Sequence, residues 1–299
     1  MDKVIIITGP TAVGKTKLSI EIAKELNTEI INGDAYQIYK DMNIGTAKPT
    51  SNELKQVKHH LIDYLNPQDE FNVCDYQQIV RKKINDFNKN NLIPLIVGGS
   101  GLYIESVICD YTFDGITRDD HFEKKYESYS NQELYDLLIS INKENAINIH
   151  PNNRKRVLRA LELSLNNQTK GTNKKELLYD TLVLFLNDER SILYERINNR
   201  VDQMIENGLF DEVKSFYPDK LSKTSKAAIG YKELFEYFDG LITQEEAIGK
   251  IKQASRNYAK RQLTWFRNKP YVTIVDINPN NLDETKYLLL TKINQFLIK

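Results

Sequence analysis

The chain has 299 residues, of which 40% are hydrophobic and 27% are charged. This length exceeds the usual size of one domain, so we expect one large core with a smaller inserted or appended unit, and the 17 Tyr and 11 Phe residues argue against a disordered chain. The 41 basic and 41 acidic residues give a net charge of zero, so nucleic acid would have to bind at local basic patches rather than in a global field.

Cysteine content and hydropathy limit the chemistry and the cellular location that we expect. Cys74 and Cys109 are too few for a disulfide framework, and we interpret them as reduced thiols that form no metal site. No apolar run approaches the roughly 18 residues that a membrane span needs. The first strand begins almost at once, which predicts no removable leader. We therefore expect a soluble, cytoplasmic protein with no membrane partner.

The first hundred residues alternate between predicted strands and helices. Short apolar runs predict strands at residues 4–8, 29–32 and 92–97. Between them, helices are predicted at residues 16–26 and 75–88. This alternation is typical of a parallel sheet covered by helices, so the sequence predicts an α/β fold.

The alternation breaks after Cys109. Residues 111–175 are polar, rich in Tyr and Asn and mostly helical in pattern, and we interpret them as an insertion that ends in a loop at residues 166–176. The elements expected after it are a strand at 180–186, helices at 189–207, 225–238 and 243–267, a strand at 272–277 and a helix at 283–297. The predicted organisation is a core of residues 1–110 and 176–299 that carries a helical insertion at residues 111–175.

A phosphate-binding motif lies between the first predicted strand and the first predicted helix. Its sequence, GPTAVGKT, fits the P-loop pattern GxxxxGK[ST] in the strand-to-helix context that the pattern requires. Glycines let backbone N–H groups turn toward an anion, Lys15 neutralises phosphate charge, and the Thr16 hydroxyl can bind Mg²⁺. The residues expected to bind a di- or triphosphate are Gly9, Pro10, Thr11, Ala12, Val13, Gly14, Lys15 and Thr16. The fold class expected is thus a P-loop NTPase-like core, with a parallel sheet and helices on both faces, plus a mostly helical inserted domain.

Two further segments follow predicted strands of the same sheet. Asp34 follows the strand at 29–32, at the sheet edge where open α/β folds bind ligands. Its carboxylate could take a proton from an attacking nucleophile, or it could only cap a turn. The sequence GGSGLY at residues 98–103 follows the strand at 92–97, although a plain tight turn explains this cluster about as well. That strand ends in glycine rather than in the Asp that holds Mg²⁺ in many ATP-using P-loop proteins, which argues against an ATPase.

Several longer blocks occur in a characteristic order. They are GPTAVGKT (9–16), GDAYQIYKDMNIGTAKP (33–49), HHLID (59–63), IVGGSGLY (96–103), HPNNRKRVLRALE (150–162), RINNRVDQMIENGLFDEV (196–213), AIGYKE (228–233) and SRNYAKRQLTWFR (255–267). With these blocks the chain resembles the tRNA dimethylallyltransferases, which prenylate adenosine 37. The resemblance implies transfer of a dimethylallyl group from dimethylallyl diphosphate to N6 of that adenosine, with Mg²⁺ as cofactor. Only residues 111–149 and the last part of the chain lack this signal.

The resemblance also implies roles for residues near the P-loop. The family's general base matches Asp34, and the arginine that stabilises the leaving diphosphate together with Lys15 matches Arg200. Gln37 matches the residue that contacts the target base. Ser100 stands near the reaction channel where the family usually has Thr, so a hydroxyl is kept. The implied catalytic residues are Asp34, Arg200, Lys15 and Ser100.

Basic segments would then contact tRNA. Arg154, Lys155, Arg156 and Arg159 cluster near a predicted helix start, although a solvated helix face also explains such a cluster. Basic residues on the helix at 243–267 alternate with aromatic residues, most of which we expect in the core. The residues expected at tRNA are Asp34, Ala35 (where Ser is frequent), Tyr36, Gln37, Ser100, Lys155, Arg156, Arg159, Arg256 and Lys260. We expect a monomer whose insertion clasps the anticodon stem-loop while the base is drawn out of its stack.

Two other functions explain part of the sequence. A small-molecule kinase would bind ATP at the P-loop and use Asp34 as its base, which accounts for the first forty residues equally well. It would not account for the basic blocks at residues 154–159 and 256–267. An RNA-binding GTPase-like switch would need a guanine-reading NKxD element, which the sequence lacks.

Overall fold

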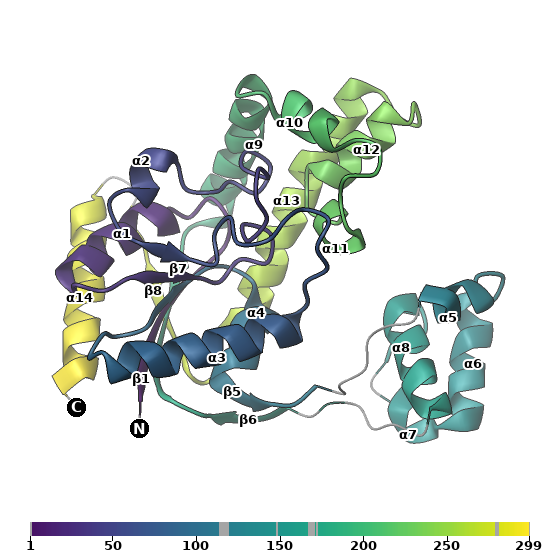
Figure 1. The fold of residues 1–299 in the computed structure, drawn as a ribbon, viewed down its shortest axis with the longest axis horizontal. Helices are drawn as coiled ribbons and strands as arrows, with labels where there is room; N and C mark the ends of the chain where they lie inside the picture. The colour runs from purple at the N-terminus through teal and green to yellow at the C-terminus, as the bar shows by residue number, and fades with distance from the viewer. Residues whose placement is uncertain are drawn as a thin grey trace. The chain divides into compact units, whose positions relative to one another are not determined.

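The computed structural model describes residues 2–113, 120–147, 149–166, 171, 173–278 and 281–298. The chain divides into two compact units, which are both visible in Figure 1. The core unit comprises Met1–Ile108 and Leu177–Lys299, and the insertion comprises Cys109–Glu176. Each unit has buried apolar side chains of its own and is described by itself below.

A parallel sheet forms the centre of the core unit. Among the described residues it has six strands in the order β3-β2-β4-β1-β7-β8. Their bounds are β1 Lys3–Thr8, β2 Ile30–Asn32, β3 His59–His60, β4 Leu95–Val97, β7 Asp180–Asn187 and β8 Val272–Asp276. Residues 4–7 of β1 are 0% exposed, because β1 lies between β4 and β7 and its side chains point into the two helix-covered faces of the sheet. The predicted α/β fold with a parallel sheet is confirmed.

Helices cover both faces of this sheet. Crossovers between parallel strands are right-handed, so helices that connect strands in opposite directions across the sheet lie on opposite faces. α1 (Lys15–Glu25) leads from β1 toward β2, whereas α3 (Val73–Lys89) leads back from β3 to β4. α14 (Leu282–Ile298) packs against α1, while α3 packs against α4 (Gly101–Ile108) and α4 against α13 (Gln244–Arg267) (Figure 1).

The remaining helices of the core unit differ in part from the predicted ones. They are α2 (Ser51–Leu54), α9 (Arg190–Glu206), α10 (Leu209–Phe216), α11 (Lys223–Lys226) and α12 (Tyr231–Phe238). The single helix predicted at 225–238 is wrong, because the chain leaves the helical conformation before Gly230, whose φ is 98°. α10 was not predicted, and Gly208 with a φ of 95° separates it from α9. Glycine adopts these left-handed conformations without the steric cost that other residues pay.

The insertion is mostly helical. β5 (Cys109–Tyr111) and β6 (Asn173–Leu177) form a two-stranded sheet where the chain enters and leaves it. Its helices are α5 (Asp120–Lys125), α6 (Asn131–Ile141), α7 (Lys143–Ala146) and α8 (Arg154–Leu165), and their buried side chains include Leu134, Leu138, Val157 and Leu161. The loop predicted at residues 166–176 is wrong from residue 173 onward, where β6 pairs with β5. Residues 167–170 and 172 of that prediction lie outside the described residues.

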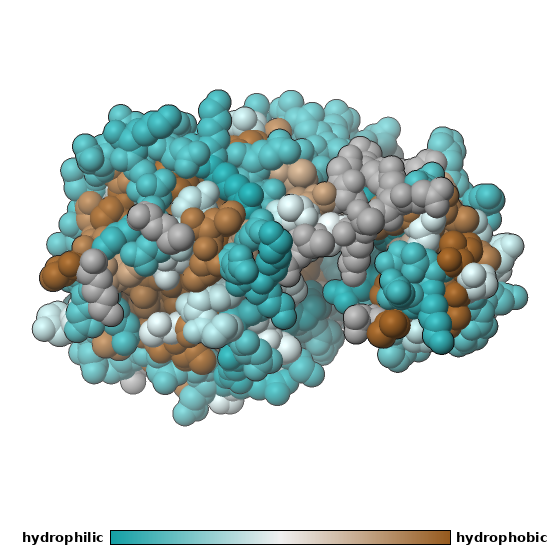
Figure 2. All heavy atoms as spheres, turned by 90° about the horizontal axis from the view of Figure 1, so that it is seen from below, coloured by the Kyte–Doolittle hydropathy of each residue, from teal (hydrophilic) through white to brown (hydrophobic). Residues whose placement is uncertain are grey.

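Hydrophilic side chains cover most of the face seen in Figure 2, with hydrophobic ones interspersed between them. Exposed apolar side chains are normal on protein surfaces. In the described part of the chain, no helix combines the length and the apolar character needed to cross a membrane.

Candidate functional site

Three neighbouring strands bring the predicted site segments together at one edge of the sheet. The P-loop follows β1, Asp34 follows β2, and the glycine turn of residues 98–101 follows β4. β4 lies between β2 and β1, so the carboxyl ends of these parallel strands are adjacent. The three segments line a cavity of about 600 Å³, which we call the polar pocket. This is the edge at which open α/β sheets bind ligands.

The strand ends approach each other so closely that they require glycine. A Cβ atom on Gly98 would lie 2.1 Å from the carbonyl carbon of Gly33, and one on Gly99 would lie 2.0 Å from Nε2 of Gln262. The Gly33 backbone cannot yield to such an overlap, whereas the Gln262 side chain could move and would then lose its hydrogen bond to Gly99. The cluster at residues 98–101 is therefore more than a tight turn, because it lets β2, β4 and α13 converge.

Lys15 lies in the polar pocket and turns back onto the P-loop. Its Nζ donates hydrogen bonds to the carbonyl oxygens of Gly9, at 2.9 Å, and Pro10, at 2.8 Å. Burial, and next the charge of Arg200, lower the pKa of Lys15 to about 7, although Asp34 opposes the shift. Two cations and one carboxylate thus meet in this pocket, where an additional anion would be stabilised.

Asn32 and Tyr36 orient Asp34. The backbone N–H of Asp34 donates to Oδ1 of Asn32 at 3.0 Å, and Nδ2 of Asn32 donates back to the carbonyl oxygen of Asp34 at 3.1 Å. One carboxylate oxygen of Asp34 accepts the backbone N–H of Tyr36 at 2.9 Å. Burial raises the pKa of Asp34, while the N–H of Tyr36 and the charge of Lys15 act against this rise. A fixed carboxylate with increased proton affinity is suited to act as a general base.

Gln262 of α13 joins the P-loop to the glycine turn, although the sequence analysis did not single it out. Its Oε1 accepts the backbone N–H of Thr11 at 2.9 Å, and its Nε2 donates to the carbonyl oxygen of Gly99 at 3.0 Å. The side chain is buried. A glutamine in a helical pattern carries no local signal for such a role, since both partners lie far away in the sequence.

The predicted hydroxyl of Ser100 also lies at this edge. Its Oγ accepts the backbone N–H of Ala35 at 3.1 Å and lies 3.5 Å from the hydroxyl oxygen of Tyr258 on α13. Ser100 therefore connects the segment after β2 with α13. Ala35 contributes a backbone group to this contact, so its lack of a hydroxyl does not matter there.

Arg200 reaches the site from α9. Its Nη1 donates to Oγ1 of Thr11 at 3.4 Å, and its Nη2 donates to the carbonyl oxygen of Ala47 at 3.5 Å. Burial lowers the pKa of Arg200, and Asp34 opposes this. The guanidinium nevertheless stays charged, because arginine side chains are not deprotonated in proteins.

A second cavity of about 210 Å³, the apolar pocket, shares part of its lining with the polar pocket. Its other walls are mainly aliphatic and include Ile197, Val201, Met204, Leu209 and Ile251. The residues that line both cavities are Thr11, Asp34, Thr46, Ala47, Arg200 and Tyr258. A ligand could thus place a charged part in the polar pocket and an apolar part in the apolar pocket. The atoms that connect the two parts would then lie beside Asp34.

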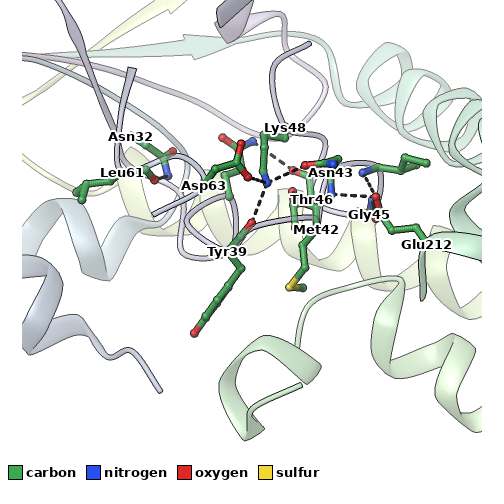
Figure 3. A network of polar contacts seen from close by, with 12 residues as sticks. Asn32, Tyr39, Met42, Asn43, Gly45, Thr46, Lys48, Leu61, Asp63 and Glu212 are labelled. Atoms are coloured by element: carbon green, nitrogen blue, oxygen red, sulfur yellow. Dashed lines mark hydrogen bonds and ion pairs between the residues drawn. The ribbon is translucent and has the colours of Figure 1, made fainter. Parts of the chain in front are cut away.

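The segment of residues 37–48, called the wall segment here, forms part of both pockets and is shown in Figure 3. Nε2 of Gln37 donates to the carbonyl oxygens of Thr46, at 3.2 Å, and Ala47, at 3.1 Å. Nζ of Lys48 donates to the carbonyl oxygen of Tyr39 at 2.8 Å and pairs with Asp63, and the Lys48 side chain is only 3% exposed. These bonds connect the two ends of the segment.

The donor set of the polar pocket fits Mg²⁺ bound together with a diphosphate. Thr16, Asp34 and Glu53 line this pocket, and their side chains carry oxygen atoms of the kind that Mg²⁺ binds. No group of three or more His, Cys, Asp or Glu side chains within the described residues is arranged to hold a metal. Mg²⁺ usually keeps several waters and binds through one or two protein ligands plus substrate phosphates, so a complete cage of protein ligands is not required.

The predicted tRNA contacts fall into both units. Lys155 and Arg156 are exposed on α8 of the insertion, whereas Arg159 forms an ion pair with Glu162 at 2.6 Å. Arg154 donates to the carbonyl oxygens of residues 126, 127 and 129, which gives it a structural role in the insertion. These positions lie on a different unit from the polar pocket.

On the core unit, α13 carries two predicted tRNA contacts. Nη1 of Arg256 donates to Oδ1 of Asn198 on α9 at 2.5 Å, so this side chain is held in place. Lys260 is exposed. Tyr36 lines the apolar pocket and Gln37 the polar pocket, close to Asp34.

Comparison with known proteins places these features in a family. Residues 37–269 match the model of the IPP transferase family. The chain is 50% identical over 286 residues to the tRNA dimethylallyltransferase of Bacillus subtilis (strain 168), which covers 92% of this chain and 91% of that protein. The corresponding protein of Halalkalibacterium halodurans is 44% identical over 294 residues, which covers 95% and 94%.

Solved structures agree with this result. The full-length tRNA isopentenylpyrophosphate transferase from Bacillus halodurans is similar with a TM-score of 0.77 at 43% identity, covering 99% of this chain and 97% of that one. A eukaryotic dimethylallyltransferase acting on tRNA gives a TM-score of 0.81 at 27% identity, covering 100% and 80%. The chain therefore belongs to the IPP transferase family.

Proposed function

We propose that this protein transfers a dimethylallyl group from dimethylallyl diphosphate to N6 of adenosine 37 in tRNA and releases diphosphate. The observation that carries the proposal is the junction of the two pockets. The polar pocket suits a diphosphate, the apolar pocket suits a short branched hydrocarbon, and Asp34 lines both. Membership of the IPP transferase family supports the same reaction.

The leaving group is stabilised by fixed positive charge. As the bond between the allylic carbon and the diphosphate oxygen breaks, negative charge grows on the oxygen. Lys15 and Arg200 lie at the pocket that would hold this group, and P-loop N–H groups add their dipoles. When bound, Mg²⁺ held by the Thr16 hydroxyl would neutralise further charge on the diphosphate.

Asp34 supplies the base. The lone pair of the adenine amine is delocalised into the ring, so the amine becomes a better nucleophile when its proton leaves as the new carbon–nitrogen bond forms. Asp34 has an increased proton affinity and lies at the junction of the pockets. It accepts that proton, and the charge on N6 never fully develops.

A kinase is not favoured by these observations. Phosphate transfer from ATP to a small alcohol leaves the aliphatic pocket beside Asp34 without a role. The relatives that match almost the whole chain are named tRNA dimethylallyltransferases.

We further propose that one chain acts alone in the cytoplasm and that its insertion contacts the anticodon stem-loop. Every side chain assigned here to the chemistry comes from one core unit, so no second copy is needed for a complete site. Lys155 and Arg156 give the insertion exposed positive charge for RNA phosphates.

Incubation of the protein with labelled dimethylallyl diphosphate and unmodified tRNA tests the reaction. We expect label in the RNA and an equal amount of released diphosphate. A tRNA with guanosine at position 37 is the control and should stay unlabelled. If the adenosine-containing tRNA stays unlabelled and ATP is consumed in a parallel assay, the proposal is wrong and the protein acts as a kinase.

A further inference from the structure

One carboxylate of α10 binds three consecutive backbone N–H groups of the wall segment. Oε2 of Glu212 accepts from Asn43 at 2.9 Å and from Ile44 at 2.8 Å, and Oε1 accepts from Gly45 at 3.0 Å (Figure 3). The hydroxyl of Tyr231 also donates to Oε1, at 2.5 Å. Hydrogen bonds to an ionised acceptor are stronger than neutral ones, so this single side chain fixes the local backbone.

The packing around Glu212 leaves the wall segment little freedom. A Cβ atom on Gly45 would lie 2.5 Å from Cε2 of Tyr231 and 3.1 Å from Cδ1 of Leu209. Burial and the charge of Glu212 raise the pKa of the Tyr231 hydroxyl, which therefore stays protonated and remains a donor. Residues 43–45 thus rest directly on α10 and α12, with Glu212 as the polar connection.

The next two residues of the segment orient Gln37. An amide nitrogen has two N–H bonds, and Nε2 of Gln37 donates to the carbonyl oxygens of both Thr46 and Ala47. The reverse orientation would place the amide oxygen against two carbonyl oxygens and is excluded by repulsion. Oε1 of Gln37 is therefore the polar atom left for a ligand in the polar pocket, which this residue lines.

We propose that Glu212 is a positioning residue for base recognition. By holding residues 43–45, it places the carbonyl groups of residues 46 and 47, which turn Oε1 of Gln37 toward the substrate. This oxygen accepts one N–H of the adenine amine while Asp34 accepts the other. A 6-oxo purine presents an oxygen at that place and is disfavoured. The inference rests on the proposed tRNA prenylation and adds to it a residue that does not line the polar pocket.

Glu212→Ala tests the proposal, with Asp211→Ala as its matched control. Asp211 is exposed in the same first turn of α10, so its removal changes the same helix end without the contacts to the wall segment. We expect Glu212→Ala to lower kcat by about 10²-fold, since a displacement of roughly 1 Å can cost that much. Glu212→Gln keeps one acceptor oxygen and should lose less, and Asp211→Ala should stay near wild type. A wild-type kcat in Glu212→Ala overturns the proposal.

A double-mutant cycle separates positioning from plain structural damage. If Glu212 acts through Gln37, then Glu212→Ala costs little further kcat once Gln37 is alanine. Losses that multiply in the double variant, together with a lowered Tm, would mean that Glu212 only supports the fold. Tm is recorded for each of the four proteins.

Amide hydrogen exchange gives a readout that does not depend on activity. Glu212→Ala should speed exchange at residues 43–45, and Asp211→Ala should not. Unchanged exchange in Glu212→Ala overturns the inference even if the protein modifies tRNA, while a wild-type protein that fails to label tRNA overturns the proposed function instead.

Discussion

Asp34 and Lys15 lie in one pocket, and burial shifts the pKa of each side chain in the direction that favours its neutral form. The pKa of the acid is raised and that of the lysine is lowered to about 7, because removal from water disfavours either charge. Both residues followed from motif position in the sequence. Their opposite shifts followed only from the pocket, where Arg200 adds a second positive charge beside Lys15.

The lowered pKa of Lys15 predicts a pH dependence of diphosphate binding. Below pH 7 the amine is charged and attracts the ligand. Above pH 7 the free protein must take up a proton on binding, so affinity should fall by up to about tenfold per pH unit. Titration of dimethylallyl diphosphate by calorimetry between pH 6 and 9 measures this.

Lys15→Met is the control for that measurement. The variant should bind weakly at low pH and should lack this decline, while titration of the ligand itself is common to both proteins. Parallel pH profiles for wild type and variant would show that the Lys15 proton is not involved.

Asp34 should limit turnover on the acid side. As a base it acts only when deprotonated, so kcat should fall as pH drops through its raised pKa. Asp34→Asn should lower kcat by about 10² to 10⁴-fold, the usual contribution of a general base. Single-turnover labelling measures the rate, and filter binding should give a tRNA Kd near wild type. Weak tRNA binding with intact chemistry would reassign Asp34 to recognition.

At the scale of elements, glycine positions decide how closely strand ends approach. Local hydrophobic patterns predicted most strands and helices, because their periodicity depends only on neighbouring residues. They missed α10, which begins directly after Gly208, and they joined α11 and α12 into one helix across Gly230, whose positive φ interrupts the helical pattern. They also failed at β6, whose polar sequence becomes a strand only through pairing with β5.

Gly98→Ala should test the convergence of β2 and β4. The added methyl would overlap the backbone of Gly33, so we expect unfolding free energy to drop by about 1–3 kcal/mol, as for other overpacked sites. Gly249→Ala in α13 is the control, because a Cβ there meets no atom within 4 Å. It should stabilise by about 1 kcal/mol through helix propensity. Urea unfolding measures the free energy of unfolding of both variants. Equal values for Gly98→Ala and Gly249→Ala would contradict the packing argument.

At the scale of the whole molecule, the core unit contains the proposed catalytic residues and the insertion contributes exposed positive charge. The cluster of basic residues was predicted from sequence, but the individual roles differ. Arg154 binds carbonyl groups and Arg159 pairs with Glu162, which leaves Lys155 and Arg156 as the exposed charges of that cluster.

Joint replacement of Lys155 and Arg156 by alanine should therefore weaken tRNA binding without harming the fold. Each lost phosphate contact should reduce the slope of log Kd against log salt by about 1. The KM for dimethylallyl diphosphate should not change. Arg154→Ala is the contrasting variant, which should lower the Tm of the insertion. If the slope of log Kd against log salt is unaltered in the double variant, Lys155 and Arg156 do not contact RNA phosphates.

The sequence by itself determined the α/β class, the P-loop, the base candidate after the second strand and the helical insertion. These depend on local periodicity and on motif spacing, which adjacent residues specify. Only the tertiary structure decided the strand order, the apolar pocket beside Asp34, and the contacts of Gln262 and Glu212. Their partners lie far away in the chain, at Thr11 and Gly99 for Gln262 and at residues 43–45 for Glu212. Such contacts exist only after the sheet has assembled and has brought the helices that follow β7 against the loops that follow β1, β2 and β4.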